Sequence, residues 1–177
     1  FDDPTRSGAP LKAFNTVGRA GILAVFNVKD GGGAVAGEVS SADIPPLKGG
    51  HFAVYEHFSG KLTALAAGKK LPVELKEYQP ALYSFVPVEN GFAPVGLADK
   101  FLSPRTVLRS DAAPGEYTVD LAAPGEFVAW LEKKPASVTV NGKSAAASAF
   151  SWKNNIFRMK LDPAAAAPVV VKIKTAK

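Results

Sequence analysis

The 177-residue sequence contains no cysteine, one methionine and two histidines. The absence of cysteine excludes disulfides, thiolate metal sites and cysteine nucleophiles. It is compatible both with a cytoplasmic protein and with an exported bacterial one, so the compartment stays open. No apolar run approaches the roughly 20 residues of a transmembrane helix, and no signal peptide is expected. Phe1 stands in place of an initiator Met, as expected of a fragment or a processed form.

The motifs of common catalytic sites are also lacking. We find no Gly-x-Ser-x-Gly elbow, dinucleotide fingerprint, phosphate loop or EF-hand pattern. His51 and His57 fall on one face of a predicted strand, but zinc needs a third ligand, which Glu38 or Asp43 would supply only by chance of folding. We therefore predict no metal site, no cofactor and no visible active site, and leave open a Ser-His-Asp triad assembled by the fold.

The net charge of +5 does not indicate a nucleic-acid partner. The lysines stand singly at alternate strand positions or in turns, as in Val171–Lys174. Backbone tracking and base stacking would need a stripe of Arg and Lys interleaved with exposed aromatics, which this sequence lacks. We predict neither a nucleic-acid nor a membrane partner.

What the sequence does contain is typical of many short strands joined by tight turns. Its 16 Gly and 14 Pro are spread without a repeat, and a hydrophobic fraction of 47% excludes a disordered chain. Residues 51–88 alternate apolar and polar side chains with period two, which predicts a β-meander. Residues 21–28 are apolar on both faces, as in a central strand of a sandwich. Asn141-Gly142 and Asn154-Asn155 predict two hairpins near the end of the chain.

We therefore predict an all-β protein, an antiparallel β-sandwich either alone or with a smaller β module appended at the C-terminus. Residues 1–10, FDDPTRSGAP, are predicted to be a linker. Residues 11–102 would form the main half of the sandwich, and residues 103–177 a second half or the appended module. The sequence leaves open whether both halves share one core.

The only tryptophans, Trp130 and Trp152, are the candidate sugar-binding residues. An exposed indole can stack on a sugar ring, whereas a tryptophan within a strand more often packs into the core. Both interpretations stay open at this point.

Several segments resemble one enzyme family in order and spacing. LKAFN (11–15) and GILAVFN (21–27) are similar to the "LKIWN…GVLGVFN" passage of the raffinose synthase and alkaline α-galactosidase family, and FDDP (1–4) resembles the "LF-x-DP" that precedes it. Three later segments are similar to that family's "F-x-x-Y…S-x-x-L", "L-x-x-x-E-x-x-L-x-x-V-x-P-V" and "FAPIGL-x-x-x-x-N" patterns: FAVYEHFSGKL, LPVELKEYQPALYSFVPVE and GFAPVGLADKF.

The resemblance implies the C-terminal β domain of such an enzyme, whose paired catalytic aspartates lie in an upstream (β/α)8 barrel and act on α-galactosides by a retaining double displacement. None of those catalytic residues corresponds to a position of this sequence. Val28 stands where plant members have a cysteine, and the tail is rich in Ala and Pro, which favours a bacterial α-galactosidase-like member.

The expected function is that of a non-catalytic accessory domain that packs on the barrel of the same polypeptide and stabilises it. Such a domain, when isolated, would expose a large apolar patch. The alternatives are a carbohydrate-binding module that recognises galactosides through exposed aromatics, and an independent enzyme of unknown chemistry. Homo-oligomers are compatible with all three.

Overall fold

The computed structural model describes residues 3–176, which form two compact units divided after Phe85. Every recorded strand pair in both units is antiparallel, which confirms the all-β prediction. The sequence suggested a division after residue 102. The structure divides earlier because β8 (Phe92–Leu97) pairs with β11 (Glu126–Leu131). Residues 86–102 therefore belong to the second unit and not to the first.

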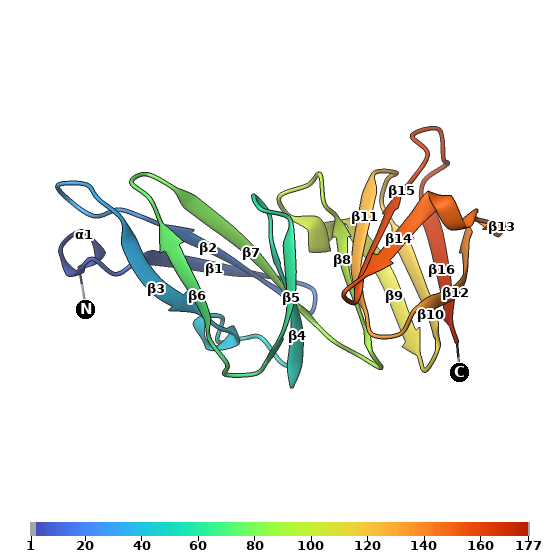
Figure 1. Cartoon of the computed structure of the whole chain (residues 1–177), viewed down its shortest axis with the longest axis horizontal. Helices are drawn as coiled ribbons and strands as arrows, with labels where there is room; N and C mark the ends of the chain where they lie inside the picture. The colour runs from blue at the N-terminus through green and yellow to red at the C-terminus, as the bar shows by residue number, and fades with distance from the viewer. Residues whose placement is uncertain (1–2, 177) are drawn as a thin grey trace. The chain divides into compact units, whose positions relative to one another are not determined.

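The first unit contains a large and a small sheet (Figure 1). The large sheet has the order β1-β2-β7-β4-β5, and the small one pairs β3 with β6. The elements in chain order are α1 (Pro4–Ser7), β1 (Leu11–Val17), β2 (Ala20–Phe26), β3 (Val35–Val39), η1 (Ser41–Asp43), β4 (His51–Glu56), β5 (Lys61–Ala66), β6 (Leu71–Leu75) and β7 (Pro80–Pro87).

The core of the first unit lies between these two sheets. Leu23 and Val25 of β2 are fully buried there, against apolar residues of β3, β4, β6 and β7. Because β2 lies between β1 and β7, the prediction of a central strand at residues 21–28 is confirmed. Apolar burial at roughly 25 cal/mol per Å² makes this cluster the main stabilising feature of the unit.

The predicted β-meander is wrong, although the segment does form strands, β4 to β7. In a meander β6 would lie between β5 and β7, but β6 pairs instead with β3, with Val73 opposite Gly37. Pro72 cannot donate a hydrogen bond, which suits β6 to the edge of a small sheet. By pairing there, β6 turns Val73 and Leu75 into the core, where they cover the apolar face of β2 and β7.

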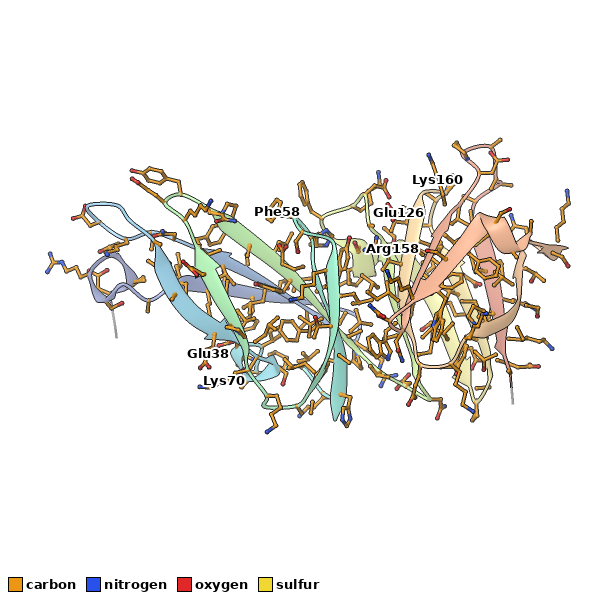
Figure 2. The ribbon with its side chains drawn as sticks, in the orientation of Figure 1. Glu38, Phe58, Lys70, Glu126, Arg158 and Lys160 are labelled. Atoms are coloured by element: carbon orange, nitrogen blue, oxygen red, sulfur yellow. The ribbon has the colours of Figure 1, made fainter. Side chains whose placement is uncertain are left out.

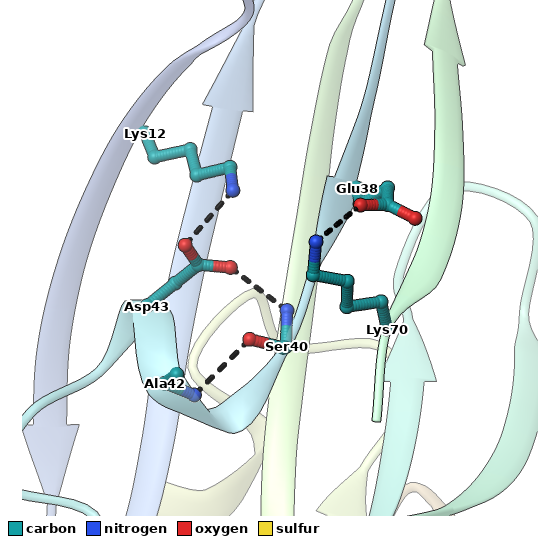
Figure 3. Close-up of polar contacts among 6 residues, drawn as sticks. All are labelled: Lys12, Glu38, Ser40, Ala42, Asp43 and Lys70. Carbon is teal, nitrogen blue, oxygen red and sulfur yellow. Dashed lines mark hydrogen bonds and ion pairs between the residues drawn. The ribbon is translucent and has the colours of Figure 1, made fainter. Parts of the chain in front are cut away.

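A polar cluster of Lys12, Ser40 and Asp43 connects the segment after β3 with the edge strand β1 (Figure 3). Ser40 Oγ accepts a hydrogen bond from Ala42 N, and Asp43 Oδ2 accepts one from Ser40 N at 2.8 Å. This is a capping box, which satisfies the free N–H groups at the start of η1. The other oxygen of Asp43 is 2.8 Å from Lys12 Nζ on β1.

Part of the segment predicted as a linker is ordered. Asp3 caps the short helix α1, and Pro4 occupies its first turn, as expected from the preferences of helix N-termini. Gly8 ends the helix in the left-handed conformation. Phe1 and Asp2 lie outside the described residues.

The second unit is a sandwich of a five-stranded and a four-stranded sheet (Figure 1). The orders are β13-β12-β16-β10-β9 and β14-β15-β11-β8, and a separate apolar core lies between them. Besides β8 and β11, its elements are η2 (Ser103–Thr106), β9 (Val107–Ala113), β10 (Glu116–Leu121), β12 (Pro135–Val140), β13 (Lys143–Ser144), η3 (Ala147–Ala149), β14 (Phe150–Lys153), β15 (Ile156–Lys160) and β16 (Val169–Thr175).

Both predicted hairpins of the second unit are confirmed. Asn141 and Gly142 join β12 to β13, and Asn154 and Asn155 join β14 to β15. All four residues have positive φ, between 49° and 79°. Two-residue turns of this kind match the twist of the flanking strands and favour Asn and Gly, which is why the sequence revealed them.

Candidate functional site

The two tryptophans lie on opposite faces of the four-stranded sheet. Trp152 is the cross-strand partner of the buried Phe157, packs against the core, and donates a hydrogen bond from Nε1 to Leu131 O at 2.8 Å. Trp130 stands between Ala129 and Leu131, both of which face the core, so its indole is on the other face. The pair therefore cannot form one stacking platform, and a sugar contact by either tryptophan stays a prediction.

The two histidines do not share a strand face. His51 begins β4, but β4 ends at Glu56, so His57 lies in the following turn, where its N–H donates to Leu82 O. Burial lowers the pKa of His57, and the neighbouring Glu56 carboxylate opposes this shift. Within residues 3–176, no three His, Cys, Asp or Glu side chains gather into a group that could hold a metal ion.

No helix in the described part of the chain is long and apolar enough to cross a membrane. The only α-helix recorded there is α1, with four residues.

The first unit carries a groove where its small sheet leaves the large one uncovered. The small sheet has two strands and the large one five, so it covers only part of the inner face of the large sheet. The groove has a volume of about 390 Å³. Its walls include Val54 and Glu56 of β4, Thr63 of β5, Val73 of β6 and Tyr83 of β7. This size falls within the range of roughly 300–1,000 Å³ typical of small-molecule sites.

Glu56 is held rigidly at one end of this groove. Its Oε1 accepts hydrogen bonds from the backbone N–H groups of Phe58 at 3.1 Å and Leu82 at 3.4 Å, and its Oε2 accepts one from Ser59 N at 2.7 Å. Burial alone would raise the pKa of Glu56, but these hydrogen bonds and one from the Ser59 side chain outweigh it, so the pKa is lowered. The carboxylate therefore closes the β4–β5 turn and stays ionised at neutral pH.

The lowered pKa of Glu56 predicts a specific pH dependence of stability. Because the folded-state pKa lies below the unfolded value of about 4.3, the stabilisation is complete above that value and is lost as the pH falls through the folded pKa. Glu56→Gln should lower the thermal midpoint at neutral pH, and the difference from wild type should vanish in acid. Thermal unfolding between about pH 2.5 and 7 measures this.

The matched control is Glu74→Gln, which changes a second carboxylate lining the same groove, from the exposed side of β6. A pH-dependent difference of equal size in Glu74→Gln would contradict the assignment to Glu56.

A second groove, of about 680 Å³, lies at one end of the four-stranded sheet of the second unit. Glu126, Arg158 and Lys160 line it (Figure 2). Arg158 Nη1 is 2.9 Å from Glu126 Oε1, and Lys160 stands directly across from Glu126 in the strand pair. These partly exposed charges largely compensate one another, and an ion pair of this kind contributes roughly 0–1 kcal/mol.

The edge of the large sheet in the first unit exposes apolar side chains. Leu11, Phe14 and Phe26 are between 39% and 50% exposed. Leu11 and Phe26 are cross-strand partners and therefore share one face, and we call them the β1–β2 apolar pair. β1 lies at the end of its sheet and is exposed along almost its whole length. An exposed edge strand with large apolar side chains is typical of an association surface.

Periodicity alone gave no means to identify these residues as a site. The pattern of LKAFN marks a strand, but whether a strand lies at an edge depends on pairing with distant segments. The second unit also exposes Phe101, Leu102 and Leu108, around η2 and the start of β9.

Comparison with known proteins identifies relatives of this chain. A family model described as raffinose synthase or seed imbibition protein Sip1 matches residues 32–162. The probable galactinol–sucrose galactosyltransferase 1 of Arabidopsis thaliana is 28% identical over 174 residues, which cover 80% of this chain and 23% of that protein. The probable galactinol–sucrose galactosyltransferase 6 of the same plant is 24% identical over 178 residues, covering 82% and 24%. The chain thus spans about a quarter of the length of these relatives.

Proposed function

Because the chain belongs to the raffinose synthase or seed imbibition protein family, we propose that it is a non-catalytic accessory β module of a larger enzyme. In this proposal the module packs on an upstream (β/α)8 catalytic barrel of the same polypeptide and stabilises it. This chain aligns with only about a quarter of the length of each relative, as expected of one module of a larger protein. A barrel needs roughly 200 residues or more of alternating strand and helix, which an all-β chain of this length does not contain.

The activity of the whole protein is part of the same proposal. The two relatives are named as galactosyltransferases that act with galactinol and sucrose. We infer that the parent enzyme transfers or hydrolyses α-galactosyl groups, and that the groups that react with the substrate lie outside this chain.

The β1–β2 apolar pair is the observation that carries the packing role. Full burial of a Leu or Phe side chain stabilises by about 1.5–3 kcal/mol, and Leu11 and Phe26 are each buried only in part. Covering both of them with an apolar surface of the barrel would add a few kcal/mol to the stability of the whole enzyme. The exposed edge of β1 offers backbone groups to the same partner.

The test compares the double variant Leu11→Asp/Phe26→Asp in the isolated chain and in the full-length enzyme. The isolated chain should lose roughly 2–4 kcal/mol, because each side chain is more than half buried and two Asp carboxylates would repel each other as cross-strand partners. The full-length enzyme should lose more than the isolated chain, since the contact with the barrel is lost as well, and become more sensitive to limited proteolysis. Calorimetry and timed trypsin digestion measure both effects.

Leu108→Asp is the matched control, because Leu108 is an exposed apolar residue of the second unit. It should leave the full-length enzyme close to wild type. An unchanged full-length double variant, or a barrel that is fully stable when expressed without this module, would contradict the proposal.

A further inference from the structure

The most exposed large apolar side chain of the described residues stands at the tip of a turn in the first unit. Tyr78 lies in the four-residue turn 76–79 between β6 and β7, and 84% of its surface is exposed. Within residues 3–176 its ring stacks on no other aromatic ring, and its hydroxyl bonds to no protein group. The turn therefore presents a whole phenol side chain to a partner.

The backbone at Tyr78 has a conformation that tyrosine does not prefer. Its φ is +56°, in the left-handed region that turns normally fill with Gly or Asn. The two preceding turns of the chain follow this preference, with Gly60 and Gly68 at positive φ. A bulky residue in this region costs free energy, and such strain is concentrated at functional positions. The formation of the turn would favour Gly at this position, so the tyrosine points to a role of its side chain.

The turn that carries Tyr78 is fixed by the buried Asn27. The side chain of Asn27 is 7% exposed, and its Nδ2 donates to Lys76 O at 3.0 Å and to Gly33 O at 2.8 Å. Within the turn, Gln79 N donates to Lys76 O, and Lys76 N donates to the side-chain oxygen of Gln79, both at 3.0 Å. The position of Tyr78 is thus formed in advance, which lowers the entropy cost of binding.

Two other segments lie beside this turn. The side chain of Glu77 lies over the loop 29–33, because a Cβ atom built on Gly32 would be 2.9 Å from Glu77 Oε1. Asp30 N donates to Thr5 O at 2.9 Å, which joins the same loop to α1. We call these three segments together the loop end of the first unit (Figure 1): residues 4–7, 29–33 and 76–79.

The upstream barrel is the partner that the loop end fits. This inference rests on the proposed function, in which the barrel precedes this chain and is therefore joined to it through α1, a part of the loop end. The β1–β2 apolar pair lies at the same end, because Phe26 stands directly across from Pro80, which begins β7 two residues after Tyr78. Tyr78 thus extends the surface that is proposed to contact the barrel.

We propose that the loop end docks on the upstream barrel with Tyr78 as its anchor, the ring in an apolar pocket of the barrel and Oη bonded to a polar group at the rim. Tyrosine combines an apolar ring with a polar tip and is enriched among the residues that dominate binding energy at interfaces. The surrounding charges of Lys29, Asp30, Lys76 and Glu77 balance, so they select neither an acidic nor a basic partner surface. This favours a contact that depends on the phenol ring.

The direct test is photo-crosslinking in the full-length enzyme. Tyr78→p-benzoylphenylalanine places a photoreactive ring at the anchor, and peptide mass spectrometry after irradiation should identify crosslinks to the barrel. The matched control is Lys69→p-benzoylphenylalanine, because Lys69 is exposed in the turn at the opposite end of β6. The control should give no crosslink to the barrel.

Three crosslinking results would overturn the assignment of Tyr78. The first is the absence of any crosslink from position 78, or crosslinks only within this module. The second is crosslinking from position 78 to a second copy of the enzyme and not to the barrel. The third is an equal yield of barrel crosslinks from positions 69 and 78.

A second test uses the strained backbone of Tyr78. Asn accepts a positive φ, so Tyr78→Asn should raise the thermal midpoint of the isolated chain by about 1–3 °C. In the full-length enzyme the same change removes the anchor, and it should lower the thermal midpoint and speed tryptic cleavage. A higher midpoint in both proteins would refute the anchor, because relief of strain would then be the only effect.

The failure of this inference can be distinguished from the failure of the proposed function. If Leu11→Asp/Phe26→Asp destabilises the full-length enzyme more than the isolated chain, and position 78 gives no crosslink, the accessory role stands and the Tyr78 anchor is refuted. If position 78 crosslinks to the barrel, and the barrel is fully stable without this module, the contact stands and the stabilising role is refuted.

Discussion

Replacing Gly96 with alanine is expected to destabilise the second unit by about 3–5 kcal/mol. Gly96 has a φ of +105°, which L side chains rarely adopt, and it lies at an irregularity in the pairing of β8 with β11. A Cβ atom there would collide with the backbone carbonyl of Ser103. Backbone strain and overpacking each cost roughly 1–3 kcal/mol, and here both apply.

The neighbourhood of Gly96 cannot move aside easily. Ser103 Oγ donates to Leu97 O at 2.6 Å, and Leu97 N donates to the Thr106 hydroxyl at 2.9 Å. The Thr106 hydroxyl in turn donates to Ser103 O at 2.6 Å. These bonds hold η2 against β8, so room for a methyl group can be made only by breaking part of the network.

Gly142→Ala provides the matched control. Gly142 also has a positive φ, +79°, but nothing lies within 4 Å of a Cβ atom built there. Its cost should therefore be the conformational strain alone, about 1–2 kcal/mol. Urea unfolding of the three proteins measures the difference, and equal losses in the two variants would refute the steric explanation.

Leu121→Ala is expected to cost about 3 kcal/mol, within the range of roughly 2–5 for such changes. Leu121 ends β10 with its side chain fully buried in the core of the second unit. Truncation removes the transfer free energy of the lost methyl groups and leaves a cavity that the flanking strands β9 and β16 can fill only in part.

Leu108→Ala on the neighbouring strand is the control for this prediction. Leu108 is 61% exposed and lies where the β9–β10 register shifts, so it has no cross-strand partner in the recorded pairing. Its loss should change the free energy of unfolding by less than about 0.5 kcal/mol. If the two leucines cost the same in denaturant unfolding, burial would not be the deciding quantity.

Local sequence was enough to predict the strands and the tight turns. Asn141-Gly142 and Asn154-Asn155 allow positive φ at low cost, so they fix two hairpins without reference to the rest of the chain. The apolar run of residues 21–28 indicated a strand covered on both sides, and β2 is central. The resemblance in the first hundred residues likewise predicted the family, which the match over residues 32–162 confirms.

Strand pairing across long separations was decided by the tertiary structure. The alternation of residues 51–88 is the same whether β6 pairs with β5 and β7 or with β3, because period two records which face is apolar and not which neighbour is adjacent. For that reason the sequence could not show that β6 pairs with β3. It also could not place the division between the units after Phe85.

The candidate sites depend on the same long-range choices. The sequence by itself determined an antiparallel all-β chain, its hairpins, its family and the lack of a recognisable catalytic motif, because each follows from side chains close together in the chain. Only the tertiary structure decided that Leu11 and Phe26 meet on an open sheet edge, that the tryptophans face apart, and that Tyr83 borders a groove beside Glu56. The physical reason is that exposure and proximity are set by which distant strands cover one another, and the periodicity of a single strand carries no record of that.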